Sequence, residues 1–408
     1  MSIFKPCIKN VETALRGIRR FFNETPLEKN TILSKHHGAS VFVKHEDRSV
    51  VRSYKYRGAY NKMASLERGS RVVTCSAGNH AQGVAYSSGL LGLQADIFMP
   101  TKTTTQKIDK VLGFGGSNVQ VFLEGDTFDE CNAIAQHYCV KKKLGFVHPF
   151  DDIKVIEGQA TVGLEILGSE SEIDYLVLPV GGGGLAAGVS SVFRQLSPHT
   201  KIIGVEPMGA ASLTTALANK GPLKLDKIDT FVDGAAVKMV GNLNYPLCEV
   251  GLDKVLCVHE GHVCSKILQM YNESGFIIEP AGVLSLCALD LLADEIIGKK
   301  VVCVVSGGNS DVFRMPEILE RSLIYEGRKQ YFRVEFAQKA GALKDFILRV
   351  LGPGDDIIYF RYTKLINRET GPVVIGIETR DKMAGIGLAK RMVEGGLVFE
   401  KLTNIADI

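Results

Sequence analysis

The stretch Tyr175-Leu176-Val177-Leu178-Pro179-Val180 runs directly into Gly181-Gly182-Gly183-Gly184 and then into Leu185-Ala186-Ala187. An unbroken apolar run of this length is typical of a strand that is buried on both faces, as in a parallel sheet. Four glycines at the start of a helix leave their N–H groups unobstructed, and such groups bind phosphate. We therefore predict a phosphate-binding loop at the carboxyl end of a parallel strand.

Similar apolar runs alternate with helix-like segments through most of the chain. Helix-like segments include Thr104–Leu112 and Gly158–Leu167. This alternation is typical of an α/β protein with doubly wound, mostly parallel sheets. The expected strands are Ser40–Lys44, Arg71–Thr74, Ala95–Met99, Val119–Leu123, Tyr175–Val180, Lys201–Val205 and Val301–Val305.

The sequence changes character near Tyr325–Lys329. The elements expected after this point have the order strand, helix, strand, strand, helix, strand, which is the ferredoxin-like arrangement. We therefore predict two domains, residues 1–325 and 330–404, and interpret the second as a ligand-sensing domain, with an oligomerisation module as the alternative. Its expected elements are Tyr331–Phe336, Gly341–Leu351, Ile357–Tyr362, Val373–Glu378, Met383–Glu394 and Leu397–Leu402.

A candidate reactive lysine lies in Ser53-Tyr54-Lys55-Tyr56-Arg57-Gly58-Ala59, between Arg52 and Arg57. Neighbouring cations lower the pKa of a lysine ammonium, and a neutral lysine can form a Schiff base. The alternative is an ordinary surface lysine, since most lysines are exposed.

A candidate anion-binding turn, Ser76-Ala77-Gly78-Asn79-His80, follows the expected strand Arg71–Thr74. A strand-to-helix turn places backbone amides at a helix N-terminus, where a substrate carboxylate can bind. Asn79 can also hydrogen-bond a phenolic oxygen of a cofactor. The alternatives are a plain helix cap by Ser76 or Asn79 and a packing or capping role for His80.

Two further candidate positions lie near strand and helix ends. Ser306 follows the expected strand Val301–Val305, so it lies at the carboxyl edge of the sheet, where it can be a neutral partner for a pyridine nitrogen or cap a tight turn. Glu279 precedes Pro280-Ala281-Gly282 and is either a buried acid near the substrate or a favourable charge before a helix.

The glycine loop also permits a different enzyme class. Gly181, Gly183 and Ala186 satisfy the pattern G-x-G-x-x-A, and Glu206 ends the next expected strand, where a dinucleotide fold has its ribose-binding acid. A nicotinamide-dependent oxidoreductase would nevertheless leave the lysine segment and the Ser76–His80 turn without a role. The three segments together favour a pyridoxal-phosphate enzyme that acts on an amino acid.

The motifs SYKYRGA, SAGNHAQG, GGGGLAAG, EPAG and SGGN, with TPL at Thr25–Leu27, occur in this order over essentially the whole chain. On these motifs the chain resembles threonine dehydratases, which belong to the tryptophan-synthase-β-like group, fold type II, of the pyridoxal-phosphate enzymes. The region after Lys329 resembles the ACT-like regulatory domain of the shorter biosynthetic forms.

The resemblance implies a role for each candidate residue. Lys55 would attach pyridoxal 5'-phosphate and act as the base at Cα of L-threonine. Asn79 would contact the cofactor's phenolic oxygen and Ser306 its pyridine nitrogen, while the turn Ser76–His80 would bind the substrate carboxylate. The backbone amides that would hold the phosphate belong to Gly181, Gly182, Gly183, Gly184 and Leu185, and the residues of the substrate turn are Ser76, Ala77, Gly78, Asn79 and His80.

The resemblance also implies the partners. It predicts a homo-oligomer, a tetramer or dimer, with isoleucine or valine as effectors and L-threonine or L-serine as substrate. Related serine racemases have a second serine where this chain has Ala77, which favours elimination over racemisation. They also bind a divalent cation through carboxylates, whereas here Ser212 replaces the second acid near Glu206, so we expect no metal.

Composition excludes other classes of partner. The chain has 408 residues, a net charge of +3 and no long run of lysine or arginine, which argues against nucleic acid and anionic membranes. No stretch is as long and apolar as a transmembrane helix, and the N-terminal region lacks the apolar run of a signal peptide. We therefore expect a cytoplasmic protein.

Overall fold

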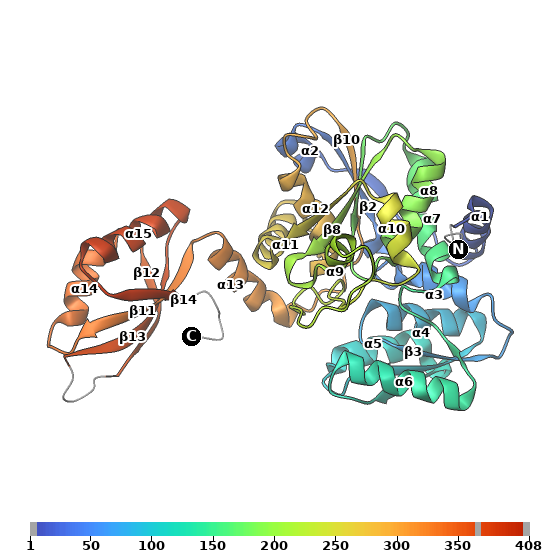
Figure 1. Ribbon diagram of the computed structural model, residues 1–408, viewed down its shortest axis with the longest axis horizontal. Coiled ribbons are helices and arrows are strands. Elements are labelled where there is room, and N and C mark those ends of the chain that lie inside the picture. The colour runs from blue at the N-terminus through green and yellow to red at the C-terminus, as the bar shows by residue number, and fades with distance from the viewer. Residues whose placement is uncertain (1–5, 364–368, 403–408) are drawn as a thin grey trace. The chain divides into compact units, whose positions relative to one another are not determined.

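The computed structural model describes residues 6–363 and 369–402, and the chain divides into two compact units, Met1–Asp311 and Val312–Ile408 (Figure 1). The first five residues of the predicted first domain, and residues 364–368 and 403–404 of the second, lie outside the described part. No helix in the described part is both long and apolar enough to cross a membrane.

The larger sheet of the first unit has six strands in the order β1-β2-β10-β7-β8-β9. Strand β1 pairs with β2 in antiparallel orientation, and the other neighbouring strands are parallel. The carboxyl ends of β10, β7 and β8 therefore share one edge. The strands are β1 (Leu27–Lys29), β2 (Ser40–His45), β7 (Tyr175–Pro179), β8 (Lys201–Pro207), β9 (Lys254–Val258) and β10 (Lys300–Val305).

A second, separate sheet has four parallel strands in the order β5-β4-β3-β6. Figure 1 shows it with α4, α5 and α6 around it. Its strands are β3 (Arg71–Cys75), β4 (Gln94–Met99), β5 (Val119–Leu123) and β6 (Gly145–Phe146). The doubly wound, mostly parallel architecture predicted from the sequence is confirmed, in two sheets.

The helices of the first unit connect these strands and cover both sheets. They are α1 (Ile8–Ile18), α2 (Thr31–His37), α3 (Lys55–Met63), α4 (Asn79–Leu91), α5 (Thr105–Gly115), α6 (Phe128–Lys142), α7 (Ile153–Ser169), α8 (Gly184–Leu196), α9 (Ser212–Ala218), α10 (Asn244–Gly251), α11 (Glu260–Ser274) and α12 (Pro280–Leu291), with the short 3-10 helices η1 (Glu46–Arg48), η2 (Gly116–Asn118) and η3 (Met208–Ala210).

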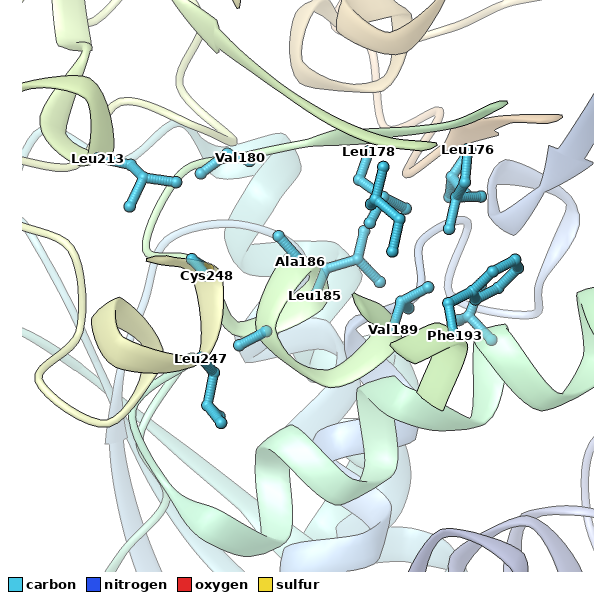
Figure 2. Packing of buried hydrophobic residues seen from close by; sticks show 14 of the residues in the cluster. Leu176, Leu178, Val180, Leu185, Ala186, Val189, Phe193, Leu213, Leu247 and Cys248 are labelled. Atoms are coloured by element: carbon cyan, nitrogen blue, oxygen red, sulfur yellow. The ribbon is translucent and has the colours of Figure 1, made fainter. Parts of the chain in front are cut away.

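The strand that precedes the glycine loop and the helix that follows it pack on each other. Leu176, Leu178 and Val180 form one buried cluster with the apolar face of α8, which includes Leu185 and Phe193 (Figure 2). Full burial of a side chain of this kind contributes about 1.5–3 kcal/mol. This packing fixes both ends of the loop Gly181–Gly184.

The second unit begins with η4 (Val312–Arg314) and α13 (Met315–Tyr325) and continues as an antiparallel sheet in the order β12-β13-β11-β14. Apolar residues of the sheet form one buried cluster with residues of α14 and α15. This is the predicted ferredoxin-like arrangement. Its elements are β11 (Lys329–Ala337), α14 (Ala342–Val350), β12 (Asp356–Tyr362), β13 (Thr370–Glu378), α15 (Lys382–Glu394) and β14 (Phe399–Leu402).

Candidate active site

One cavity brings the reactive-lysine segment and the glycine loop together. The glycine loop follows β7. The lysine segment is held at the end of β10, because Ser53 pairs with Gly307 and the Tyr54 N–H donates to the Ser306 carbonyl at 3.2 Å. The cavity is lined by Tyr54, Lys55, Phe150, Pro179, Gly181, Gly182, Gly183, Gly184, Leu185, Gly234 and Val237.

Lys55 is the first residue of α3, and its Nζ donates to the Pro149 carbonyl at 2.9 Å. Burial lowers the pKa of its ammonium to about 8, and the carboxyl of Glu279 opposes this shift. The predicted direction of the shift agrees with this value, but the predicted cause was wrong. Arg52 is exposed, and the charge of Arg57 is balanced by buried carboxylates, so burial and not the flanking cations depresses the pKa.

The glycine loop has no space for side chains. A Cβ on Gly182 would lie 2.4 Å from ring carbons of Phe150, and one on Gly181 would lie 2.8 Å from the Ala235 Cα. Gly183 has a φ of +87°, which favours glycine, and serves as the N-cap of α8 without a side-chain cap in the described residues. The loop thus presents backbone amides at the start of α8 beside Lys55, and these residues fit a phosphate-bearing cofactor.

The turn Ser76–His80 leads from β3 into α4, as predicted. Ser76 Oγ accepts from the Gly78 N–H at 3.2 Å, and Gly78 is the N-cap of α4. Within the described residues no side chain caps this helix, so neither Ser76 nor Asn79 is the plain cap of the alternative interpretation. A Cβ on Gly78 would meet nothing within 4 Å, so the turn borders open space.

The ring of His80 is buried, and its Nε2 lies 3.0 Å from the Val147 carbonyl. Burial, with the charge of Lys55, lowers the pKa of the imidazole to about 3, so the ring is neutral. The side chain has a packing role in this structure, and only the backbone N–H of His80 belongs to the turn.

Asn79 is held by two other polar side chains. Its Nδ2 donates to Glu279 Oε1 at 2.7 Å, and its Oδ1 accepts from Asn309 Nδ2 at 2.8 Å. Glu279 also accepts from the Asn309 N–H at 3.2 Å. The cluster Asn79–Glu279–Asn309 therefore fixes the amide of Asn79 and leaves it one N–H for a further acceptor. Glu279 is buried and also directly precedes α12, so both interpretations above agree with its position, and its place near a substrate stays a prediction.

Ser306 follows β10 at the carboxyl edge of the larger sheet, as predicted. Its side chain is buried, and Oγ donates weakly, at 3.4 Å, to the Ala281 carbonyl. Gly307, next to it, lies against the Asn79 cluster, because a Cβ there would lie 2.3 Å from Glu279 Oε1.

Glu206 has a structural role that conflicts with the nicotinamide interpretation. It is buried, and its carboxylate accepts from the N–H groups of Leu213 and Thr214 at 2.7 and 2.8 Å. A ribose-binding acid would instead face the glycine loop. Glu206 therefore anchors the start of α9.

The carboxyl group of Glu279 makes a pH-dependent contribution to stability. Burial, with the nearby charge of Asp233, raises its pKa from 4.5 to about 7. The folded protein therefore holds this proton more tightly than the unfolded chain, and stability falls as pH rises from about 4.5 to about 7, by ~3 kcal/mol.

We expect Glu279→Gln to remove this pH dependence. The difference in the free energy of unfolding, variant minus natural chain, should rise as pH increases from about 4.5 to about 7 and stay constant above pH 7. Urea unfolding at a series of pH values, without added cofactor, measures it. The exposed Glu67→Gln is the matched control. A difference that does not change with pH would show that Glu279 titrates normally.

The sequence did not indicate all residues of the cavity. Phe150, Gly234 and Val237 lie in segments without a motif or clear periodicity, and only the fold brings them to the glycine loop. The same holds for Pro149, which does not line the cavity but accepts a hydrogen bond from Lys55. Asn309 belongs to the SGGN motif, but its bond to Asn79 depends on the meeting of β10 and α4.

Comparison with known proteins agrees with this geometry. Residues 18–307 match the family model of pyridoxal-phosphate-dependent enzymes, and residues 320–406 match the C-terminal regulatory domain of threonine dehydratase. The biosynthetic L-threonine dehydratase of Halalkalibacterium halodurans is 49% identical over 91% of each chain. That of Bacillus subtilis is 47% identical over 94% of this chain and 92% of its own.

A solved structure gives the same result. The processed form of threonine deaminase isoform 2 from Solanum lycopersicum superposes with a TM-score of 0.74 at 39% identity, covering 78% of this chain and 88% of its own. Identity of this extent, with both family models matched in order, excludes the nicotinamide interpretation. The chain belongs to the threonine dehydratase family of pyridoxal-phosphate-dependent enzymes and has its C-terminal regulatory domain.

Proposed function

We propose that the protein is an L-threonine dehydratase that converts L-threonine to 2-oxobutanoate and ammonia, the first step of isoleucine biosynthesis. The observation that carries this is the half-buried Lys55 in one cavity with the glycine loop, in a chain 49% identical to a biosynthetic L-threonine dehydratase. L-Threonine loses its β-hydroxyl group as water. Hydrolysis then consumes one water and releases the amino group as ammonia, so the net products are 2-oxobutanoate and ammonia.

Different residues would hold different parts of the cofactor; among them, Ser306 and Asn79 lie outside the cavity lining given above. We assign the phosphate to the backbone amides from Gly181 to Leu185, the pyridine nitrogen to Ser306 and the phenolic oxygen to the remaining N–H of Asn79. When bound, pyridoxal phosphate supplies an electron sink for the electron pair left on Cα. The neutral Ser306 hydroxyl does not hold a proton on the ring nitrogen, which suits a reaction whose leaving group departs promptly.

Lys55 performs two tasks in this proposal. It would hold the cofactor, and its Nζ would take the proton from Cα of the substrate. A pKa of about 8 keeps a useful fraction of the amine neutral near physiological pH, which a general base requires. The amides at the start of α4, in the turn Ser76–His80, hold the substrate carboxylate. Ala77 provides no acid on the opposite face, so elimination is favoured over racemisation.

L-Serine is the competing substrate. One methyl group changes binding by only ~1–3 kcal/mol, or about 10–200-fold in kcat/KM. Steady-state assays of 2-oxobutanoate formed from L-threonine and pyruvate formed from L-serine decide between them. We expect the larger kcat/KM with L-threonine. A larger value with L-serine would make the protein a serine dehydratase of the same family.

We assign catalysis to residues 1–325 and regulation to residues 330–404, with isoleucine or valine as the effector, in a cytoplasmic homotetramer or homodimer. The match to the C-terminal regulatory domain of threonine dehydratase supports this division. The first unit is compact by itself and contains every candidate site residue.

A chain that ends at Arg328 is expected to keep L-threonine turnover and to lose its response to isoleucine and valine. The reason is that the truncation removes the ferredoxin-like sheet and leaves the cavity residues in place. Initial rates with and without each amino acid, for the full and truncated chains, measure this. A truncated enzyme that still responds would place the effector site in the first unit.

A further inference from the structure

Arg57 lies two residues after Lys55, yet its side chain has no contact with the cavity. It is fully buried and occupies the centre of a polar cluster inside the first unit. We call this cluster the Arg57 network. Its members are Thr25, Lys44, Glu46, Arg57, Thr161 and Glu165.

Two carboxylates fix the guanidinium from both sides. Nε and Nη2 of Arg57 donate to the two oxygens of Glu46 at 2.8 and 2.9 Å. Nη1 and Nη2 donate to the two oxygens of Glu165 at 3.0 and 2.7 Å. Bidentate pairs of this kind restrict both position and orientation, which a single ammonium contact does not.

The network joins four separate segments of the chain. Thr25 belongs to the TPL motif, Glu46 to η1, Arg57 to the first turn of α3 and Glu165 to α7. Thr25 Oγ1 donates to Glu46 at 2.6 Å, and Lys44 Nζ donates to the Thr25 carbonyl at 2.6 Å. The network thus gives the TPL motif a role, because it ties this segment to the helix that begins with Lys55.

The energetics indicate a geometric role. Buried Lys44 and Arg57 pair with buried Glu46 and Glu165, and the partly exposed Arg19 lies 3.3 Å from Glu165. Although burial alone would raise the pKa of Glu165, Arg57 and Lys44 hold it at about 2. Buried ion pairs are often no more stabilising than apolar side chains of similar volume. What the ion pairs add is directional hydrogen bonds, which an apolar core cannot provide.

The helix geometry connects the network to the reactive lysine. Residues two apart on an α-helix point about 200° apart, so Arg57 faces the core where Lys55 faces the cavity. Neighbouring helices also approach the backbone of this turn closely, since a Cβ on Gly158 would lie 2.5 Å from the Arg57 carbonyl. The turn is therefore held by its neighbours, and the network sets its rotation.

We infer that Arg57 is a positioning residue: through its two carboxylate partners it fixes the rotation of the first turn of α3 and thereby the place of Lys55 Nζ. The inference rests on the proposed role of Lys55 in cofactor attachment. It predicts that a change at Arg57 alters the Lys55–cofactor linkage without any contact between Arg57 and the cofactor.

The test is Arg57→Lys in the full chain, which keeps the charge and loses the bidentate geometry. Two readouts are needed: the dissociation constant of pyridoxal phosphate and the pH midpoint of the visible band of the lysine-linked cofactor. We expect about tenfold weaker binding or more and a shifted midpoint. Thr161→Val removes one hydrogen-bond partner of Arg57 Nη1, at 3.1 Å. We expect it to weaken cofactor binding and shift the midpoint in the same direction, but less. If Arg57→Lys does not fold, Thr161→Val is measured in its place.

Two control variants separate positioning from general effects. Met63→Ala, at the buried far end of α3, lowers the melting temperature without touching the network. Arg19→Gln removes a partly exposed cation that lies 3.3 Å from Glu165. Arg19 is not part of α3. Both should leave the midpoint unchanged.

The outcomes are distinguishable. The inference would be overturned if Arg57→Lys only lowered the melting temperature. In that case its dissociation constant for pyridoxal phosphate and its pH midpoint would equal those of Met63→Ala. A natural chain that attaches no cofactor at Lys55, as found by borohydride reduction and peptide mass spectrometry, would instead overturn the proposed function.

Discussion

Lys55→Ala is expected to abolish covalent cofactor attachment and to reduce L-threonine turnover by about 10³-fold or more. The variant loses both the amine that binds the cofactor and the general base at Cα, and a general base alone contributes about 10²–10⁴-fold. Borohydride reduction followed by mass spectrometry measures the attachment, and the rate of 2-oxobutanoate formation measures turnover.

Lys62→Ala is the matched control for this variant. Lys62 is on the same helix, but its ammonium pairs with Asp152 at 2.7 Å and does not line the cavity. It should keep both attachment and rate. Full turnover in Lys55→Ala would contradict the proposed mechanism.

Gly182→Ala is expected to weaken cofactor binding by about a hundredfold, the second largest effect. The added Cβ would lie 2.4 Å from ring carbons of Phe150, so the ring must move within the cavity that it lines. The movement disturbs the loop whose amides we assign to the phosphate. Titration of the purified variant with pyridoxal phosphate, followed by absorbance, gives the dissociation constant.

Gly168→Ala provides the comparison, because a Cβ there meets nothing within 4 Å near the end of α7. It should bind the cofactor as the natural chain does. If Gly182→Ala binds with the same affinity as Gly168→Ala, the loop does not hold the phosphate.

Much of the fold was predictable because its strands are short, continuously apolar and followed by glycine or polar turns. Tyr175–Val180 is an example, where the pattern alone indicated burial on both faces. The strand Lys254–Val258 was not predicted, although Val255–Val258 is apolar; it lies at the sheet edge, and most of its residues are only half-buried. The split into two sheets also depends on strand pairing, which no local pattern encodes.

The candidate site was predictable as three separate segments, each at a strand or helix end. The sequence did not indicate in which direction the individual side chains of these segments point. Arg57 was interpreted as a cation acting on Lys55, whereas the helix turns it into the core, where Glu46 and Glu165 balance its charge. His80 likewise belongs to the predicted turn, but its ring is buried with Nε2 next to the Val147 carbonyl. Both differences follow from helix rotation.

The most direct test of the central claim is the visible absorption spectrum of the purified protein before and after addition of L-threonine. We expect a visible band from cofactor linked to Lys55, a change in this band when L-threonine is added, and accumulation of 2-oxobutanoate. A protein that stays colourless with added pyridoxal phosphate and forms no 2-oxobutanoate would contradict it.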